Sequence, residues 1–395
     1  MRVTVLGAGR VGGAIAKDLA EEKGWAIRAV DRSQRSLEKL GNHVGLEAAR
    51  KDVASDETLR AVIRDADLVV NAVPGDMGFQ TMRRIIDAGK NVVDISFSSE
   101  DPFELDNLAK QRGVTAIVDC GVAPGLSNVI AGHVHSHMDN VESYLCLVGG
   151  LPVVRSWPYE YKAVFSPLDV MAEFTRPARF VEHGELVVRP ALSDVELIDF
   201  RGVGTLEAFN TDGLRSLART MHIPFMKEKT MRYPGHANLV RVFRDSGFFG
   251  TEYMDIDGLK VKPIDVTSRL LIDQWRLAEN EEDLTVMQVI MEGRHDGRRQ
   301  RRDFYMLDRF DSASGTTSMA RTTGYTCAIA ARQVLTGMFT RKGICPPEYL
   351  GATSGCYERM LTELGRRNIH IEVAVTDLSA GASYREINRF QRKIA

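Results

Sequence analysis

Apolar positions in the first 120 residues follow two different spacings. Short apolar runs that end at a glycine or an acid predict strands, and apolar residues three and four apart predict helices. The predicted strands are Arg2–Leu6, Trp25–Val30, Val44–Ala48, Leu68–Val73, Asn91–Ile95 and Thr115–Val118. The predicted helices are Arg10–Glu22, Asp56–Arg64, Met77–Ala88 and Pro102–Arg112. This alternation predicts an N-terminal doubly wound α/β fold with a parallel sheet.

The pattern changes after Asp119, because strand-like runs then follow one another without intervening helices. These runs are Ser143–Val148, Leu186–Arg189, Gly204–Phe209, Lys229–Tyr233, Leu259–Lys262, Leu284–Gly293 and Phe304–Phe310. They predict a second, α+β domain on a mixed or antiparallel sheet. Glycine and proline predict turns at 149–152 and 232–235. A further apolar helix is predicted over Met319–Thr336, and we expect boundaries that give segments 1–122, 123–318 and 319–395.

Composition and charge exclude several classes of protein. The chain has 395 residues, of which 51 are basic and 53 acidic, and its net charge of -2 gives no general reason to bind nucleic acid. No apolar run is long enough to span a membrane, and the N-terminus lacks the pattern of a signal peptide. Five cysteines without a C-x-x-C pair predict reduced thiols and a cytoplasmic protein.

A glycine-rich turn, G-A-G-R-V-G, follows the first predicted strand and opens the first helix at residues 7–12. In this context the G-x-G-x-x-G spacing is typical of dinucleotide-binding (Rossmann) domains. The first glycine permits the turn, the second lets the backbone approach a pyrophosphate, and the third allows close helix packing. The helix N-terminus favours the phosphates. The predicted cofactor-binding residues of this turn are Gly7, Gly9, Arg10, Val11 and Gly12.

The second predicted strand is followed by Asp31, where a carboxylate accepts hydrogen bonds from the adenosine ribose. The same carboxylate repels a 2′-phosphate, so Asp31 favours NAD over NADP. Arg32 beside it can receive that phosphate, and NADP therefore remains the alternative.

Further cofactor contacts are expected where other strands end, because ligands bind at the carboxyl edge of such sheets. Asp52 and Val53 follow the third predicted strand, and Ala72 and Val73 end the fourth.

Motifs from both halves of the chain resemble the saccharopine dehydrogenase-like family. These motifs are V-L-G-A-G at 5–9, V-V-N-A-V at 69–73, V-V-D-I-S at 92–96, D-C-G-V-A-P-G at 119–125, G-G-L-P at 149–152 and T-M-R-Y-P-G-H at 230–236. The resemblance extends from the N-terminus to Pro347. Within the family, the chain is most similar to the lysine 6-dehydrogenases.

The resemblance implies an NAD(P)-dependent oxidoreductase that acts on a carbon–nitrogen bond of a small amino-acid substrate. It also implies a homodimer in which 1–122 bind the dinucleotide, 123–318 bind substrate and dimerise, and 319–395 return to the first domain and form the tail. Arg232 is expected to hold a substrate carboxylate. The other expected substrate-binding residues are Tyr161, Asn210 and Asp212.

Three positions depart from the glutamate-forming saccharopine reductases of the family. Those enzymes carry arginine, aspartate and cysteine where this chain has Thr211, Ala123 and Val148. Saccharopine has three carboxylates and needs several polar partners, so these changes favour a smaller amine. The predicted reaction is the oxidative deamination of L-lysine at its ε-carbon. The alternatives are a saccharopine or carboxynorspermidine-type reductase and, in another class, an NAD-binding sensor without turnover.

Lysine oxidation transfers a hydride from Cε to the nicotinamide, and hydrolysis of the iminium then releases ammonia. The amine must first be neutral, although the pKa of lysine is near 10.4. The candidate proton acceptors are Asp94, Asp119 and His236, and the sequence does not choose among them. Arg232 could equally be an internal ion-pair partner, Tyr161 a core residue and His236 an ordinary turn residue. No metal is expected.

Overall fold

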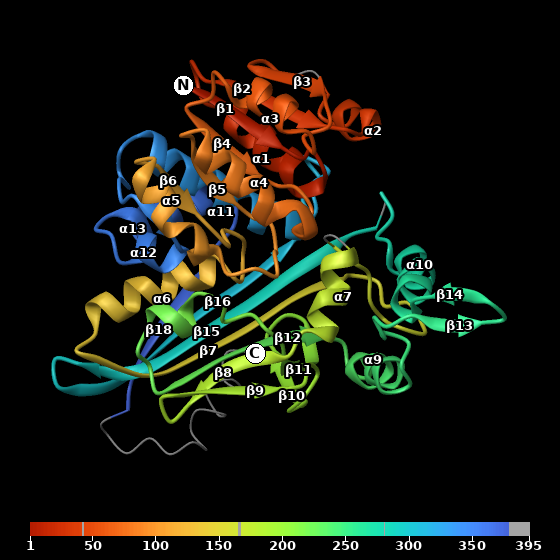
Figure 1. The fold of residues 1–395 in the computed structure, drawn as a ribbon. Helices are drawn as coiled ribbons and strands as arrows, with labels where there is room; N and C mark the ends of the chain where they lie inside the picture. The colour runs from red at the N-terminus through yellow and green to blue at the C-terminus, as the bar shows by residue number, and fades with distance from the viewer. Residues whose placement is uncertain (42, 165–166, 280, 379–395) are drawn as a thin grey trace. The chain divides into compact units, whose positions relative to one another are not determined.

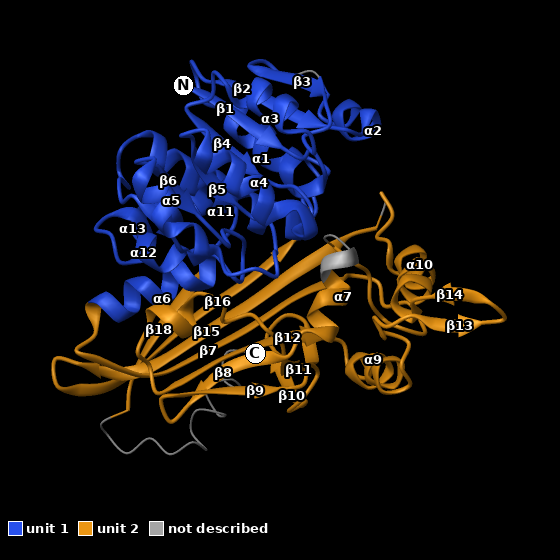
Figure 2. Cartoon of the chain, in the orientation of Figure 1, with its two compact units in different colours: residues 1–136, 311–370 blue, residues 137–310, 371–395 orange. Residues whose placement is uncertain are grey.

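The computed structural model describes residues 1–41, 43–164, 167–279 and 281–378 (Figure 1). The chain divides into two compact units (Figure 2). The first unit contains residues 1–136 and 311–370, and the second contains residues 137–310 and the chain from Ile371 onward. The segment predicted over 319–395 therefore lies partly outside the described residues, at 379–395. Among the helices that are described, none is long and apolar enough to cross a membrane.

The first unit is built on a seven-stranded sheet in the order β17-β6-β5-β4-β1-β2-β3, and all its pairs are parallel. Six of its strands follow the 3-2-1-4-5-6 order of doubly wound dinucleotide-binding folds. The predicted N-terminal fold is therefore confirmed. The strands are β1 (Arg2–Leu6), β2 (Ala26–Asp31), β3 (Leu46–Arg50), β4 (Leu68–Asn71), β5 (Asn91–Asp94), β6 (Thr115–Ile117) and β17 (Gly343–Cys345).

Helices of the first unit pack against this sheet through apolar faces, which form a buried core with the strands. The third strand was predicted two residues too early, since the side chain of Val44 is 95% exposed. A short helix that the apolar pattern did not reveal follows Ser33, whose side chain caps it by accepting from the Ser36 N–H. The helices are α1 (Arg10–Ala20), α2 (Gln34–Glu38), α3 (Asp56–Ile63), α4 (Gly75–Asp87), η1 (Pro102–Leu105), α5 (Asp106–Gln111), α6 (Leu126–His137), α11 (Ser318–Leu335), α12 (Pro347–Gly351) and α13 (Cys356–Arg366).

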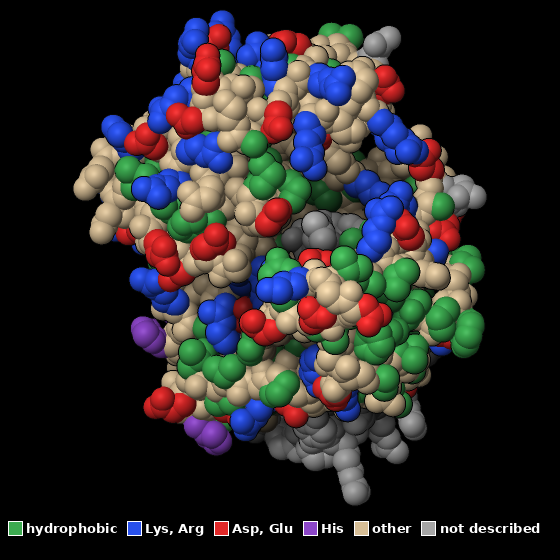
Figure 3. All heavy atoms as spheres, turned by 45° about the vertical axis from the view of Figure 1, so that its right-hand side comes forward, with side chains coloured by type: hydrophobic (Ala, Val, Ile, Leu, Met, Phe, Trp, Pro, Cys, Tyr) green, Lys and Arg blue, Asp and Glu red, His purple; other side chains and the backbone are tan. Residues whose placement is uncertain are grey.

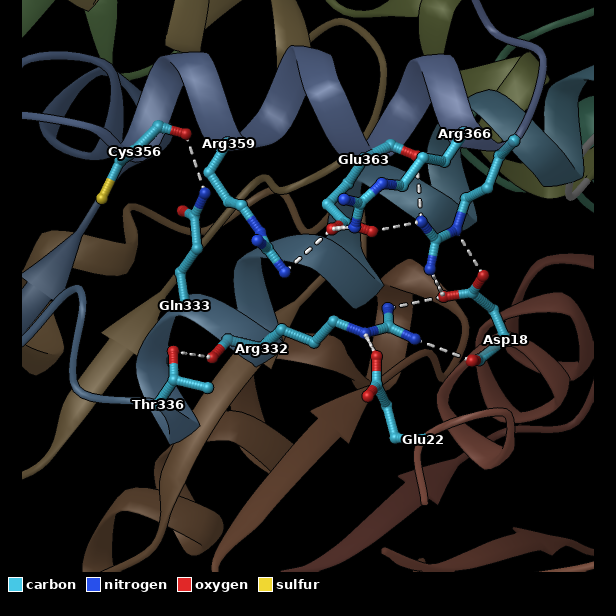
Figure 4. Close-up of polar contacts among 10 residues, drawn as sticks. Asp18, Glu22, Arg332, Gln333, Thr336, Cys356, Arg359, Glu363 and Arg366 are labelled. Carbon is cyan, nitrogen blue, oxygen red and sulfur yellow. Dashed lines mark hydrogen bonds and ion pairs between the residues drawn. The ribbon is translucent and has the colours of Figure 1, made fainter.

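The segment 311–370 is tied to the first helix of the chain. A Cβ on Gly324 of α11 would lie 3.3 Å from Ile15 Cγ1 and 3.4 Å from the Val11 carbonyl oxygen, so α11 packs directly against α1. Buried charges then join three helices, as Figure 4 shows. Arg332 of α11 donates to Asp18 at 2.6 Å, and Arg367, just after α13, donates to the same carboxylate at 2.5 Å.

The second unit is built on a nine-stranded mixed sheet. Its main path is β10-β11-β12-β7-β15-β16-β18, with β8 and β9 joined to β12. Only β12 and β7 pair in parallel, and the other pairs are antiparallel. The prediction of a mixed or antiparallel sheet is confirmed. The strands are β7 (Asn140–Pro152), β8 (Ala178–Glu182), β9 (Glu185–Arg189), β10 (Glu196–Phe200), β11 (Gly204–Asn210), β12 (Phe225–Arg232), β15 (Asp283–His295), β16 (Arg298–Arg309) and β18 (Glu372–Asp377).

One expectation for this unit was wrong. The segment 149–152 is the end of β7 rather than a turn, and Gly150 pairs with Thr285 of β15. A Cβ on Gly149 would lie 2.5 Å from the Met231 carbonyl oxygen, so this glycine serves a close approach between strands. The strand predicted at Leu259–Lys262 is present as β14 (Leu259–Val261), and it pairs with β13 (Met254–Ile256) in a separate hairpin.

Four helices of the described chain flank the sheet of the second unit, and three of them, α7, α9 and α10, contribute to an aromatic core with the strands. The turn predicted at 232–235 is present, because β12 ends at Arg232 and Gly235 precedes α9 with φ +100°. The helices are α7 (Pro167–Thr175), α8 (Leu217–Thr220), α9 (His236–Asp245) and α10 (Pro263–Trp275). Basic and acidic side chains are interspersed on the face drawn in Figure 3, as expected for a balanced charge.

Candidate active site

The glycine turn of the first unit is shaped by contacts that exclude any side chain. Gly7 has φ +92°, and a Cβ there would lie 2.3 Å from the Ala72 carbonyl oxygen at the end of β4. A Cβ on Gly12 would lie 2.0 Å from the Gly7 carbonyl oxygen. These two glycines therefore allow the turn to close against β4 and α1.

Gly9 differs from these two glycines, because no described residue occupies the space a side chain would take. Within the described part of the chain, no atom lies within 4 Å of a Cβ built on Gly9, and its φ of -65° suits any residue. Gly9 precedes α1, and no side chain among the described residues caps that helix end. Open space beside free N–H groups fits a pyrophosphate, which needs close approach to the backbone. The residues present therefore fit a dinucleotide.

Asp31 ends β2 and faces the same turn. One carboxylate oxygen accepts from the Ala8 N–H and the other from the Ser33 N–H, both at 2.7 Å. The acid is thereby held at the edge of the glycine turn, where a ribose would bind. Arg32 is exposed, and its carbonyl oxygen accepts from the Arg50 side chain.

The other predicted cofactor residues have different surroundings. Asp52 is exposed and uses its carboxylate to accept from the Ala54 N–H at 3.0 Å. Val53 and Val73 are buried in the core of the first unit. Ala72 contributes its carbonyl oxygen to the glycine turn. Val53 and Val73 therefore pack the fold, and their role towards a cofactor stays a prediction.

Asp94 ends β5 in a buried polar cluster. Its carboxylate is 3% exposed and accepts from Asn71 Nδ2 at 2.6 Å and from Ser96 Oγ at 2.7 Å. Burial raises the pKa of Asp94 to about 8, and the neighbouring charge of Asp119 adds to the rise, while both hydrogen bonds oppose it. A carboxyl group with this pKa can hold or release a proton near neutral pH.

Asp119 lies close to Asp94 in the first unit and is also buried. Its backbone has φ +51°, which places it at a sharp change of direction after β6. Cys120 follows, and burial raises the pKa of its thiol above the usual range, so it stays a protonated thiol. Two of the three proposed proton acceptors thus lie together at the carboxyl edge of the first sheet.

Arg232, at the end of β12, is the centre of a second cluster that lies wholly within the second unit. Its side chain is 2% exposed. Nη2 donates to Glu173 Oε2 at 2.8 Å, and Nη1 donates to the Met231 carbonyl oxygen at 2.9 Å. Nε is buried and has no partner among the described residues. A buried guanidinium with an unused donor is suited to bind a carboxylate.

Aromatic side chains surround this guanidinium. The Tyr161 ring lies 4.8 Å from the carbon of the Arg232 guanidinium, and Trp275 packs edge-on against Tyr161 at 5.5 Å. The Tyr161 hydroxyl and Trp275 Nε1 are buried without a hydrogen-bond partner in the described part of the chain. Burial raises the pKa of Tyr161, with a further rise from Glu173 that Arg232 opposes, so the hydroxyl is a neutral donor.

His236 belongs to the same cluster, with its ring centroid 4.8 Å from that of Tyr161. Its Nδ1 lies 3.1 Å from the Tyr159 carbonyl oxygen, and Nε2 has no partner within the described residues. Burial lowers the pKa of His236 to about 3, and the charge of Arg232 lowers it further. The imidazole is therefore neutral and is a much weaker proton acceptor than Asp94.

Asn210 and Asp212 are not brought beside Arg232. The antiparallel register pairs Asn210 with Lys229 and Glu207 with Arg232, so Asn210 lies three residues from Arg232 along the pairing, about 10 Å away. Asn210 Nδ2 donates to Asp194 at 2.8 Å. Asp212 accepts two hydrogen bonds from Arg179, at 2.7 and 2.8 Å. Both side chains are thus engaged in contacts within the fold.

Sequence reasoning missed three residues of the second cluster. Glu173 and Trp275 come from helices far along the chain, and no local motif surrounds them. Glu207 is buried opposite Arg232 and accepts from the Gly235 N–H at 2.9 Å and from the Ala237 N–H. It thereby fixes the start of α9 at His236. The sequence marks Glu207 only as an isolated acidic residue within the predicted strand Gly204–Phe209.

Comparisons with known proteins agree with this geometry. A sequence profile described as the saccharopine dehydrogenase NADP binding domain matches residues 3–117, and one described as the saccharopine dehydrogenase C-terminal domain matches residues 121–369. The expectation of a nicotinamide dinucleotide cofactor is therefore confirmed, and the enzyme class is that of an oxidoreductase.

Relatives of known name cover almost all of the chain. The saccharopine dehydrogenase [NADP(+), L-glutamate-forming] of Schizosaccharomyces pombe is 22% identical, covering 95% of this chain and 99% of that protein. The carboxynorspermidine synthase of Vibrio cholerae is 24% identical, covering 89% and 92%. The structure of apo saccharopine dehydrogenase (L-Glu forming) from Saccharomyces cerevisiae has a TM-score of 0.76 at 20% identity, covering 95% and 99%. The chain belongs to the saccharopine dehydrogenase family.

Proposed function

We propose that the protein is an NAD-dependent dehydrogenase that oxidises the side-chain amine of an α-amino acid, with L-lysine oxidised at its ε-carbon. The observation that carries the proposal is Arg232, a buried guanidinium inside an aromatic cluster whose Nε has no hydrogen-bond partner among the described residues. An α-carboxylate would supply the missing acceptor, and the aromatic side chains suit an aliphatic chain.

The position of Thr211 supports a small substrate. The reductases that form glutamate carry an arginine there, whereas here the buried Thr211 hydroxyl lies 2.8 Å from that of Thr230. No cation is therefore supplied at this position for a further carboxylate. Lysine has one carboxylate and fits this reduced set of charges better than saccharopine.

When bound, the dinucleotide accepts the hydride. The residues expected to hold it are Gly9 and the start of α1 for the pyrophosphate and Asp31 for the ribose. The negative charge of Asp31 supports NAD over NADP, because a 2′-phosphate would be repelled. We assign Asp94 as the proton acceptor for the substrate ammonium, since its pKa of about 8 exceeds that of His236 by far.

The proposed reaction consists of a proton transfer, a hydride transfer and a hydrolysis. Asp94 takes one proton from the ε-ammonium, Cε gives up a hydride, and the resulting iminium cation reacts with water to release an ammonium ion and an aldehyde. Arg232 holds the α-carboxylate throughout and thereby orients Cε.

A second candidate function is the oxidation of saccharopine or the reductive formation of carboxynorspermidine, which the names of the relatives favour. Reduced cofactor formed at 340 nm should be followed with NAD or NADP and lysine or saccharopine at pH 9 to 10, together with released ammonia. The proposal predicts turnover of lysine with NAD and equimolar ammonia. Turnover of saccharopine alone, with glutamate released, would support the second candidate.

The resemblance also implies a homodimer, and the cysteine pattern predicts a cytoplasmic protein; both stay predictions. Sedimentation of the full chain would check the first.

A further inference from the structure

The second unit contains two arginine–carboxylate pairs that differ in how completely they are closed. Arg179 binds Asp212 through Nε and Nη2, with both carboxylate oxygens used. Arg232 binds Glu173 through Nη2 alone, and its Nε is left without a partner in the described chain. A pair that served only to stabilise the fold would be expected to make two hydrogen bonds, one to each carboxylate oxygen, as Arg179 and Asp212 do. In the Arg232 pair, Nε is a hydrogen-bond donor that no described residue uses.

Glu173 is also accessible in a way that Arg232 is not. The side chain of Glu173 is 20% exposed, against 2% for Arg232. Glu173 lies on α7 and Arg232 on β12, so the fold brings an anion and a cation from two elements to one place. A ligand that reaches the guanidinium therefore meets the carboxylate as well.

Charge balance then decides which ligands can bind. The Arg232–Glu173 pair is neutral, so a simple carboxylate would place two anions on one guanidinium in a largely buried position, which is unfavourable. A zwitterion brings its own cation. Its carboxylate can bind Arg232 while its ammonium binds Glu173, and every charge then has a partner.

We propose that Glu173 binds the α-ammonium group of the substrate, so that Arg232 and Glu173 together select the zwitterionic head of a free α-amino acid. The inference rests on the part of the proposed function that makes the substrate an amino acid. It adds a specificity-determining residue and excludes simple amino-carboxylates and diamines as good substrates.

The test compares two ligands that have no side-chain amine. L-Norleucine carries the zwitterionic head, and hexanoate carries the carboxylate alone. Binding of each to the full chain with NAD is measured by calorimetry at pH 7. The wild type should bind L-norleucine at least about tenfold more tightly than hexanoate. Neither ligand can be deaminated at a side chain, so the result does not depend on turnover of lysine.

The variant Glu173→Gln should move the two affinities in opposite directions. L-Norleucine should bind at least about tenfold more weakly, because its ammonium loses its partner, whereas hexanoate should bind more tightly, because repulsion is removed. Glu182→Gln, which makes the same chemical change in an ion pair with Lys227 of the same unit, is the matched control and should leave the ratio unchanged. An unchanged ratio in Glu173→Gln, or an equal loss of both ligands, overturns the inference.

A measurement on the wild type alone covers the case in which Glu173→Gln fails to fold. 2-Hydroxyhexanoate replaces the α-ammonium of L-norleucine by a neutral hydroxyl and keeps the carboxylate. The proposal predicts that it binds at least about tenfold more weakly than L-norleucine. Equal affinities would show that the ammonium is not recognised and would overturn the inference, whereas a failure of lysine turnover would affect only the reaction proposed above.

Discussion

The glycine turn of the first unit and the Arg232 cluster of the second unit are built from different parts of the chain. The turn uses backbone atoms from six consecutive residues, and its shape depends on the absence of side chains at Gly7 and Gly12. The cluster uses charged and aromatic side chains from Tyr161 to Trp275, brought together by three helices, a strand and a loop. The first arrangement suits a ligand that every member of a fold class binds, and the second suits a ligand that distinguishes one member from another.

The largest effect is expected when the second cluster loses its cation. Arg232→Ala should lower kcat/KM for lysine on the order of 10³-fold, because the substrate carboxylate loses its partner and Glu173 is left with an uncompensated charge. Cofactor affinity, measured by fluorescence titration, should change little. Arg179→Ala removes an arginine from the same unit and serves as the control. An equal loss of NAD affinity in Arg232→Ala would contradict the assignment of Arg232 to substrate binding alone.

The next largest effect is expected at Asp94. Asp94→Asn should lower kcat on the order of 10²-fold, since the proton acceptor is removed. In the wild type, the rate of oxidation should rise with pH through about 8, as Asp94 ionises, and this inflection should be absent from the variant. A pH profile that keeps the inflection would assign the proton transfer to another group.

Asp94 should also affect stability in a defined direction. Its folded pKa of about 8 is above the unfolded value of 3.8, so the folded state binds more protons between these two pH values. The wild type should therefore lose unfolding free energy as pH rises from about 4 to 8, and Asp94→Asn should lose less. Chemical denaturation of both proteins at pH 5 and pH 8 measures this difference, and parallel losses would contradict the raised pKa.

Two glycine-to-alanine substitutions, at Gly9 and Gly12, test the glycine turn. Gly9→Ala has room and an ordinary φ, so thermal stability should be retained, while NAD should bind roughly tenfold more weakly because the added methyl group occupies the space of the phosphates. Gly12→Ala places Cβ against the Gly7 carbonyl oxygen and should lower both stability and NAD affinity. Tight NAD binding by Gly9→Ala would show that the open space has another use.

The smallest effect is expected for cofactor choice. Asp31→Asn removes the charge and keeps one of the two acceptor oxygens, so one of the contacts with the Ala8 and Ser33 N–H groups is lost. The ratio of NADP to NAD affinity should therefore rise by roughly fivefold to tenfold, because the repulsion of a 2′-phosphate is removed. Titration with each cofactor measures the ratio. A ratio that does not change would mean that Asp31 serves only to hold the turn.

The sequence predicted those parts of the molecule that are formed by residues close together in the chain. The strand–turn–helix pattern at 7–12 and the acid at Asp31 lie close together in the chain, and their roles follow from backbone chemistry. Gly149 was misjudged because a glycine needed for close strand contact looks the same in a sequence as a glycine in a turn. The role of Asn210 towards a substrate stays a prediction, and the antiparallel register, which a linear motif does not reveal, places Glu207 opposite Arg232. Glu173 and Trp275 depend on long-range packing, which no short motif records.

The central claim is that hydride leaves the side-chain carbon that bears the amine of a free amino acid. The most direct test is a single turnover of NAD with L-lysine that carries deuterium at both ε-positions, followed by mass spectrometry of the reduced cofactor. If Cε of lysine gives up the hydride, the reduced nicotinamide should carry one deuterium, and one equivalent of ammonia should be released. Reduced cofactor without deuterium, or no reduction with lysine while saccharopine is oxidised, would contradict it.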